Sequence, residues 1–143
     1  MPDTFWSSNA VIIFIALFII FDVLILLRIF VFKKAKLSSG DVKYFQGVWS
    51  KILTEHDAKL QILEADKLLD KIMMKYGYKG SLGEKLKKGA SHFHDIDGLW
   101  AAHKCRNKIA HELHYQVSIQ ERRRVLQQFE RAFKDLGIFR KQS

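Results

Sequence analysis

Two hydrophobic patterns divide the chain. Residues 10–32 read AVIIFIALFIIFDVLILLRIFVF, an almost continuous apolar run, whereas apolar positions in residues 42–137 recur three and four apart. The first pattern predicts a helix long enough to cross a hydrocarbon core of about 30 Å. The second predicts amphipathic helices that each bury one face. We therefore expect an all-α protein in which an N-terminal transmembrane helix is followed by a four- to five-helix bundle.

The apolar run contains two charged residues, Asp22 and Arg28. Arg28 is one turn from the inner end, where its side chain can extend to the interface. Asp22 lies near the middle, where a carboxylate costs about 2.5 to 3.5 kcal/mol on insertion scales. We expect Asp22 either to face another helix in an oligomer or to be protonated. Because no Lys or Arg precedes the run, it does not resemble a cleaved signal peptide.

The charges that flank the run predict its direction. Residues 33–36 read KKAK, and residues 1–9 contain no Lys or Arg. By the positive-inside rule, we expect a single-pass protein of the cell membrane, with its N-terminus outside and its C-terminal domain in the cytoplasm. The predicted parts are an extracytoplasmic segment at residues 1–9, the span at 10–32, a basic juxtamembrane linker at 33–41, the helical domain at 42–137 and a tail at 138–143.

The first half of the helical domain lacks helix breakers. From Val42 to about Tyr76 the apolar spacing is helical, and Asp41 is a plausible N-cap. We expect one long helix, or two in series with a bend at residues 54–57. Gly77 stands where a glycine commonly ends a helix.

Capping signals divide the second half. SLGE at 81–84 and SIQE at 118–121 have the spacing of a capping box. They predict a short basic helix that ends near Gly89 and a last helix that stops at Gly137. Between them, we expect a helix that Asp95 or Asp97 caps and that runs to about His114.

The net charge of the domain indicates which kinds of partner it could bind. The chain carries +9 at pH 7, and the part from Lys33 onward carries +10, with 23 of the 24 basic and 13 of the 15 acidic residues. Such a balance suits nucleic acid or a phospholipid surface. The single cysteine, Cys105, excludes an intramolecular disulfide and fits a reducing compartment.

One predicted helix carries an unusual polar row. LWAAHKCRNKIAHE, residues 99–112, places His103, Arg106, Asn107 and His111 within one arc of about 140° at 100° per residue. A helix normally gives such an arc to apolar residues, since buried polar groups need partners. These side chains therefore either pair with neighbours or form a site.

RNKIAH, residues 106–111, matches the R-x4-6-H motif of HEPN domains, with a polar residue after the arginine. HEPN domains are small helical bundles that carry this motif on a long helix ahead of a final helix, so residues 42–137 resemble the family in helix order too. Many are metal-independent ribonucleases that act as dimers, often in toxin or defence systems. The resemblance implies RNA as substrate, a homodimer through the motif helix, and no metal or cofactor.

The resemblance also implies roles for the motif residues. His111 would be the acid and base at the RNA 2′-hydroxyl and the leaving oxygen, and Arg106 would stabilise the scissile phosphate. Asn107 would orient His111 or bind the phosphate, and the products would be a 2′,3′-cyclic phosphate and a 5′-hydroxyl. Further substrate-binding candidates are His103, Lys104, Lys108, Glu64, Asp66 and Lys67.

The sequence is also compatible with two functions other than a ribonuclease. Some HEPN domains are non-catalytic dimerisation, RNA-binding or partner-docking modules; Arg106 would then pair with an acidic residue such as Asp66 or Glu64, with His111 near the helix C-terminus. A third function class is a peripheral scaffold that binds anionic lipid through Lys85, Lys87, Lys88 and the Arg122–Arg124 run. The histidines lack the CxxC or HExxH spacing of zinc sites, so we expect no metal.

Overall fold

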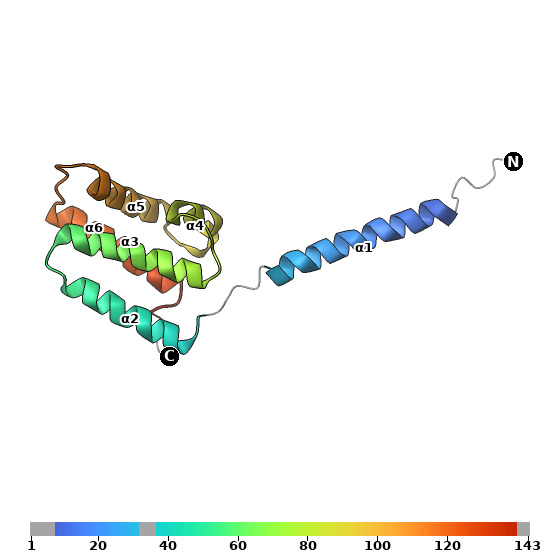
Figure 1. Ribbon diagram of the computed structural model, residues 1–143, viewed down its shortest axis with the longest axis horizontal. Helices are drawn as coiled ribbons and strands as arrows, with labels where there is room; N and C mark the ends of the chain where they lie inside the picture. The colour runs from blue at the N-terminus through green and yellow to red at the C-terminus, as the bar shows by residue number, and fades with distance from the viewer. Residues whose placement is uncertain (1–7, 32–36, 140–143) are drawn as a thin grey trace. The chain divides into compact units, whose positions relative to one another are not determined.

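The computed structural model describes the backbone of residues 8–31 and 37–139 and the side chains of residues 11–26 and 37–139. Over these residues the protein is all-α, with six α-helices, a short 3₁₀ turn and no strand, which confirms the predicted class. The chain divides into two units, residues 1–34 and 35–143. Figure 1 shows the first as a single helix and the second as a helical bundle.

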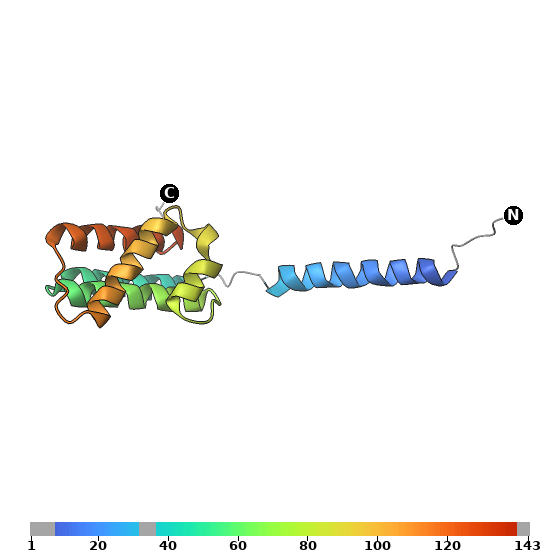
Figure 2. The same cartoon turned by 90° about the horizontal axis from the view of Figure 1, so that it is seen from above.

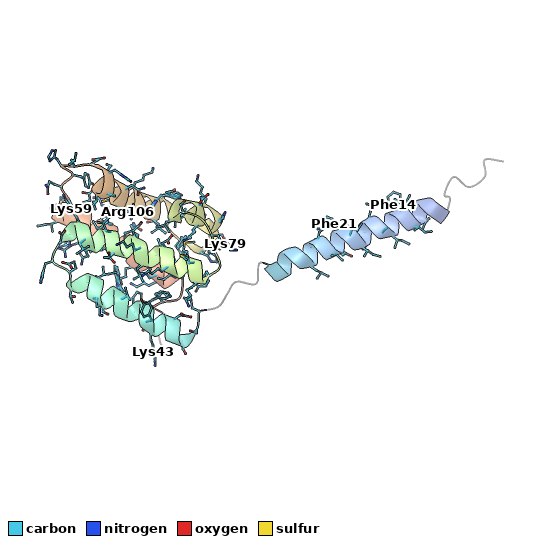
Figure 3. All side chains as sticks on the ribbon, in the orientation of Figure 1. Phe14, Phe21, Lys43, Lys59, Lys79 and Arg106 are labelled. Atoms are coloured by element: carbon cyan, nitrogen blue, oxygen red, sulfur yellow. The ribbon has the colours of Figure 1, made fainter. Side chains whose placement is uncertain are left out.

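The first unit contains α1, Ser8–Val31. Every side chain from residue 11 to residue 26 is exposed, and no described residue of this unit packs against them. Figure 3 shows Phe14 and Phe21 projecting from it. Asp22 is exposed as well and makes no hydrogen bond or ion pair with a described residue.

No helix among the described residues is long and apolar enough to cross a membrane. The membrane span predicted over residues 10–32 stays a prediction. Several predictions concern residues that lie outside the described part of the chain. These are residues 1–7 of the predicted N-terminal segment, the basic run 33–36, the side chain of Arg28 and residues 140–143 of the predicted tail.

Five α-helices and the 3₁₀ turn make up the second unit, in agreement with the predicted four to five helices. They are α2, Ser39–Thr54; α3, Ala58–Lys75; α4, Leu82–Lys88; η1, Ala90–His92; α5, Ile96–His111; and α6, Ile119–Asp135. α3 is central, because it packs against α2, α4, α5 and α6. Figure 2 shows α5 crossing over α3 rather than lying parallel to it.

The core lies between α2, α3, α5 and α6. Ile62 and Leu69 of α3 and Phe129 and Phe133 of α6 are fully buried. Trp49 of α2 packs its ring edge to face on Phe133, with the centroids 5.0 Å apart. Truncating one such aromatic side chain to Ala typically costs about 3–5 kcal/mol. This core therefore holds the helices that carry the candidate site.

α2 and α3 are separate helices with the break at residues 55–57, where one of the two sequence expectations places it; the chain reverses there instead of continuing in series, and the expectation of one long helix is wrong. Asp57 begins α3 as its N-cap, with a side chain that accepts hydrogen bonds from the first-turn N–H groups, and further contacts hold the turn. The side-chain amide of Gln61 donates to the carbonyl of Ile52 at 2.9 Å, and Arg122 of α6 donates to the carbonyl of Glu55 at 3.2 Å. Gln61 also accepts from Nε of Arg122.

Two of the predicted caps, those of α4 and α5, are confirmed in full. The Ser81 and Glu84 capping box opens α4, and the Asp95 side chain accepts from Gly98 N–H at the start of α5. α2 instead begins after Ser38, whose side chain accepts from the N–H of Asp41. Asp41 is thus not the N-cap but the reciprocal partner in a capping box, with its carboxylate on Ser38 N–H.

The last third of the domain departs in detail from the expectation. α5 ends at His111 rather than near His114. Ser118 caps α6 as predicted, but the carboxylate of Glu121 accepts from the Tyr115 hydroxyl instead of completing the box. Packing also continues past the predicted domain end, because Ile138 is buried.

Candidate functional site

Four polar side chains of α3 and α5 form a closed ring of contacts. Nδ1 of His103 donates to Oδ1 of Asp66 at 2.8 Å, and Nε of Arg106 lies 3.2 Å from Oδ2 of the same carboxylate. Nη1 of Arg106 donates to Oδ1 of Asn107 at 3.1 Å. The ring closes where Nδ2 of Asn107 lies 3.5 Å from Nε2 of His103. We call these four residues the Asp66 cluster.

The protonation of His103 follows from its neighbours. An ionised carboxylate only accepts hydrogen bonds, so Nδ1 of His103 carries a proton. Nε2 then accepts from the Asn107 amide when the imidazole is neutral. The ring of His103 also lies edge to face with Trp100, at 5.9 Å between centroids. Three elements of the local packing therefore fix this imidazole.

Asp66 is the buried member of the cluster, with 4% of the residue exposed. A buried carboxylate is costly without partners of opposite charge, and Arg106 and His103 are placed to supply them. The spacing of α5 makes this possible, because residues three and four apart share a helix face. His103, Arg106 and Asn107 follow that spacing where α5 crosses α3.

Arg106 is only partly engaged by these contacts. Its Nε is buried and close to Asp66, yet the N–H is not directed at the carboxylate, so Nε has no hydrogen-bond partner among the described atoms. Nη2 is neither buried nor hydrogen-bonded to a described residue. Figure 3 labels Arg106 in the region where α5 and α3 meet. Part of the guanidinium therefore stays open to a ligand.

The cluster lies in the wall of an open groove of about 700 Å³ between α3, α5 and residues 80–83. His103, Arg106 and Asn107 line it from α5. α3 contributes Asp66 and, on its exposed side, two lysines, Lys67 and Lys71. The groove thus joins an oriented guanidinium to an imidazole and two ammonium groups.

A second acidic side chain of α3 faces this groove. Asp70, one turn after Asp66, accepts from Nζ of Lys85 at 2.6 Å, and the Lys85 side chain is only 3% exposed. The expectation that Lys85 belongs to a lipid-binding surface is wrong, because it lies on the buried side of α4 with Leu82 and Leu86. The spacing of these apolar neighbours was the signal for its burial, and the i to i+4 spacing from Asp66 was the signal for Asp70.

The arginine run at the start of α6 contains one side chain that is hydrogen-bonded within the bundle and two that are exposed. Arg122 is occupied by Gln61 and the Glu55 carbonyl, whereas Arg123 and Arg124 are exposed. Lys87 and Lys88 of α4 are also exposed. Figure 3 shows labelled lysines at separate corners of the bundle, so positive charge is spread over several faces; they are Lys43, Lys59 and Lys79.

His111 does not join the cluster. It is the last residue of α5, it is exposed, and it makes no hydrogen bond or ion pair with a described residue. Five residues of helix turn it about 140° away from Arg106. Within one chain, the structure therefore brings together His103, Arg106 and Asn107 but leaves His111 outside the groove.

Three of the other substrate-binding candidates predicted from the sequence do not line the groove. Lys104 and Lys108 are exposed on α5, and Nζ of Lys108 lies 5.7 Å from the centroid of the Tyr115 ring. Glu64 pairs with Lys67 at 2.6 Å along α3 and does not line the groove. Of the two acidic partners considered for Arg106, Asp66 is therefore the one that contacts it.

Comparisons with family models, with curated proteins and with solved structures find no match to this chain. Within residues 11–26 and 37–139, no group of three or more His, Cys, Asp or Glu side chains is arranged to hold a metal ion. The fold and the site together define an all-α bundle with a polar, partly cationic groove between α3 and α5.

Proposed function

We propose that the domain is a HEPN-like, metal-independent endoribonuclease. The observation that carries the proposal is the guanidinium of Arg106, which Asp66 and Asn107 orient at the wall of an open groove while Nη2 stays free. A fixed planar cation of this kind is suited to a phosphodiester whose negative charge increases in the transition state. The RNKIAH motif, residues 106–111, supports the same function.

The proposed reaction is transfer of the phosphoryl group within RNA. The 2′-oxygen attacks the neighbouring phosphorus, the bond to the 5′-oxygen breaks, and the products are a 2′,3′-cyclic phosphate and a 5′-hydroxyl. The imidazole of His111 takes the proton of the 2′-hydroxyl and delivers a proton to the leaving 5′-oxygen, so the protons balance. His111 is the proposed acid and base, since its imidazole is exposed and imidazole is the side chain that enzymes use most often for proton transfer.

The positions of Arg106 and His111 favour a site shared by two chains. The two side chains leave α5 on different sides, and His111 lies outside the groove of its own chain. In a twofold dimer through α5 in which the His111 of one chain meets the Arg106 of the other, this contact occurs twice and gives two equivalent sites. We therefore propose a homodimer through α5 as the active form.

Residues 10–32 are proposed to hold the domain at the cell membrane, with residues 37–139 on the cytoplasmic side. The apolar sequence and the basic run that follows it support this placement. The exposed apolar side chains of residues 11–26 support it as well, since a continuous apolar surface of this kind needs a partner or a lipid phase.

The test is RNA cleavage by the full-length chain, purified in detergent, with EDTA present throughout. We expect fragments with cyclic phosphate ends, and loss of cleavage in Arg106→Ala and His111→Ala. His114→Ala and Arg123→Ala are the matched controls, because both residues are exposed and lie outside the groove. Intact RNA, or equal loss in a variant and its control, would contradict the proposal.

A second function is favoured by the contact between Asp66 and Arg106. An ion pair inside a closed polar ring is also what a non-catalytic module would use to fix α5 on α3. In that case the bundle is an RNA-binding or partner-docking module at the membrane. RNA that is bound but not cleaved, with the same affinity in His111→Ala, would select this function.

A further inference from the structure

A second hollow continues from the groove of the Asp66 cluster. It has a volume of about 560 Å³, lies between α2 and α3, and is bounded by Tyr44 and Lys75. It shares Lys71 and Met74 with the first groove. The two hollows therefore lie next to each other, on either side of Lys71 and Met74, and we call the surface from Arg106 across α3 to Tyr44 the α3 track.

Lys71 supplies the uncompensated charge at the junction of the two hollows. The three carboxylates of the α3 track are each held by a basic side chain, in the pairs Asp41 with Lys75 at 3.0 Å, Asp66 with Arg106 at 3.2 Å, and Asp70 with Lys85 at 2.6 Å. Lys71 is exposed and forms no ion pair with any residue in the described ranges. An anionic ligand that crosses from one hollow to the other would therefore contact Lys71.

Tyr44 and Met74 give the second hollow an exposed apolar surface. Tyr44 is 59% exposed and Met74 is 57% exposed. The Tyr44 ring contacts Phe45 at 5.5 Å between centroids, which steadies it while most of the residue stays accessible. An exposed aromatic ring beside a basic groove is the combination that proteins use for single-stranded nucleic acid, whose bases stack on the ring.

We propose that the α3 track binds single-stranded RNA next to the scissile bond, with a phosphate at Lys71 and an unstacked base on Tyr44. The inference deepens the proposed ribonuclease function and rests on it for the position of the scissile bond. Single-stranded RNA is required because the bases of a duplex are stacked on one another and do not present a face to a side chain.

The test measures binding and cleavage in the same samples. Fluorescence anisotropy of a short labelled RNA is recorded with the full-length chain in detergent and EDTA, over a series of salt concentrations. Tyr44→Ala is expected to weaken binding by roughly 5- to 150-fold, the effect of losing one base stack, while Tyr44→Phe binds as the wild type. Lys71→Ala is expected to reduce the slope of log affinity against log salt by about 0.7.

Lys51→Ala is the charge-matched control, since Lys51 is exposed on α2 and lines neither hollow. If binding is unchanged in Tyr44→Ala and Lys71→Ala, or if Lys51→Ala loses as much affinity, the proposal that the α3 track binds RNA is overturned, even if the RNA is cleaved. Binding that depends on Tyr44 and Lys71 without cleavage would keep the track and overturn only the ribonuclease. A dependence on Lys71 for vesicles of anionic phospholipid, but not for RNA, would also overturn the proposal.

Discussion

Oδ2 of Asp66 on α3 lies 3.2 Å from Nε of Arg106 on α5, and this ion pair joins the two helices at the candidate site. The same carboxylate accepts from His103 at 2.8 Å. One buried acidic side chain thus orients two basic side chains of the next helix. Both the stability of the domain and the geometry of the groove depend on it.

Asp66→Asn is expected to destabilise the domain by about 1–3 kcal/mol. The amide keeps the shape of the carboxylate but removes the charge that Arg106 and His103 face, and partly buried hydrogen bonds to charged groups have this magnitude. The measurement is urea unfolding of the full-length chain in detergent. Asp97→Asn is the control, since Asp97 is exposed in the first turn of α5. Equal stability of the two variants would show that the Asp66 contacts contribute nothing net.

Lys85→Ala is expected to cost about 2 kcal/mol, because it leaves Asp70 without its partner and removes a packed aliphatic stem. Asp70 is one-third exposed, so water limits the loss to less than a fully buried pair would give. Thermal unfolding beside Lys87→Ala, an exposed lysine of the same helix, measures the difference. A Lys87→Ala variant that is equally destabilised would argue against the burial of Lys85.

Low pH is expected to destabilise the fold through the capping boxes at the N-termini of α2 and α4. The Ser38 hydroxyl, followed by Lys75, lowers the pKa of Asp41 below its usual 3.8, and the backbone N–H of Ser81 lowers the pKa of Glu84 below 4.5. A carboxylate whose folded pKa is depressed stabilises the fold above the unfolded pKa, and this contribution is lost as pH falls through the folded value.

The measurement is the free energy of unfolding between neutral pH and pH 3. Glu84→Gln is expected to flatten the fall in acid, since the amide cannot titrate. Glu130→Gln, at an exposed ion pair of α6, is the comparison. An acid slope that is the same with and without Glu84 would mean that its hydrogen bonds to Ser81 are not formed in solution.

Cys105 is expected to react slowly with iodoacetamide in the folded protein. Burial raises the pKa of its thiol, so little thiolate is present near neutral pH, and the residue is 5% exposed. Mass spectrometry of alkylation over time, with and without urea, gives the comparison. Rapid modification without urea would indicate that α5 opens readily at its contact with Tyr115.

The local elements could be predicted from the sequence where one signal determines them. Ser81 and Ser118 set the starts of α4 and α6, and Gly77 and Gly137 adopt the positive φ that follows a helix. The reversal between α2 and α3 follows only in part from local signals, because Asp57 caps α3 but Arg122, far away in the chain, also holds the turn. A capping box hidden before Asp41 moved the start of α2 by three residues.

The candidate site was predictable in membership but not in geometry. The polar row of α5 follows from helical spacing, and Asp66 was already a candidate on the earlier helix. The choice of Asp66 over Glu64 depends on where α5 crosses α3, which no local pattern encodes. The separation of His111 from the groove likewise depends on this crossing, because α3 faces the side of α5 that carries Arg106, and His111 lies about 140° around the helix from it.

The most direct test of the account is complementation between two inactive variants. Arg106→Ala and His111→Ala are expected to be inactive alone and are then mixed and allowed to exchange subunits in detergent, with EDTA present. If each site takes Arg106 from one chain and His111 from the other, mixed dimers regain one intact site of two, and about a quarter of the wild-type RNA cleavage returns. A mixture that stays inactive, although subunit exchange is verified by differently tagged chains, would contradict the shared site.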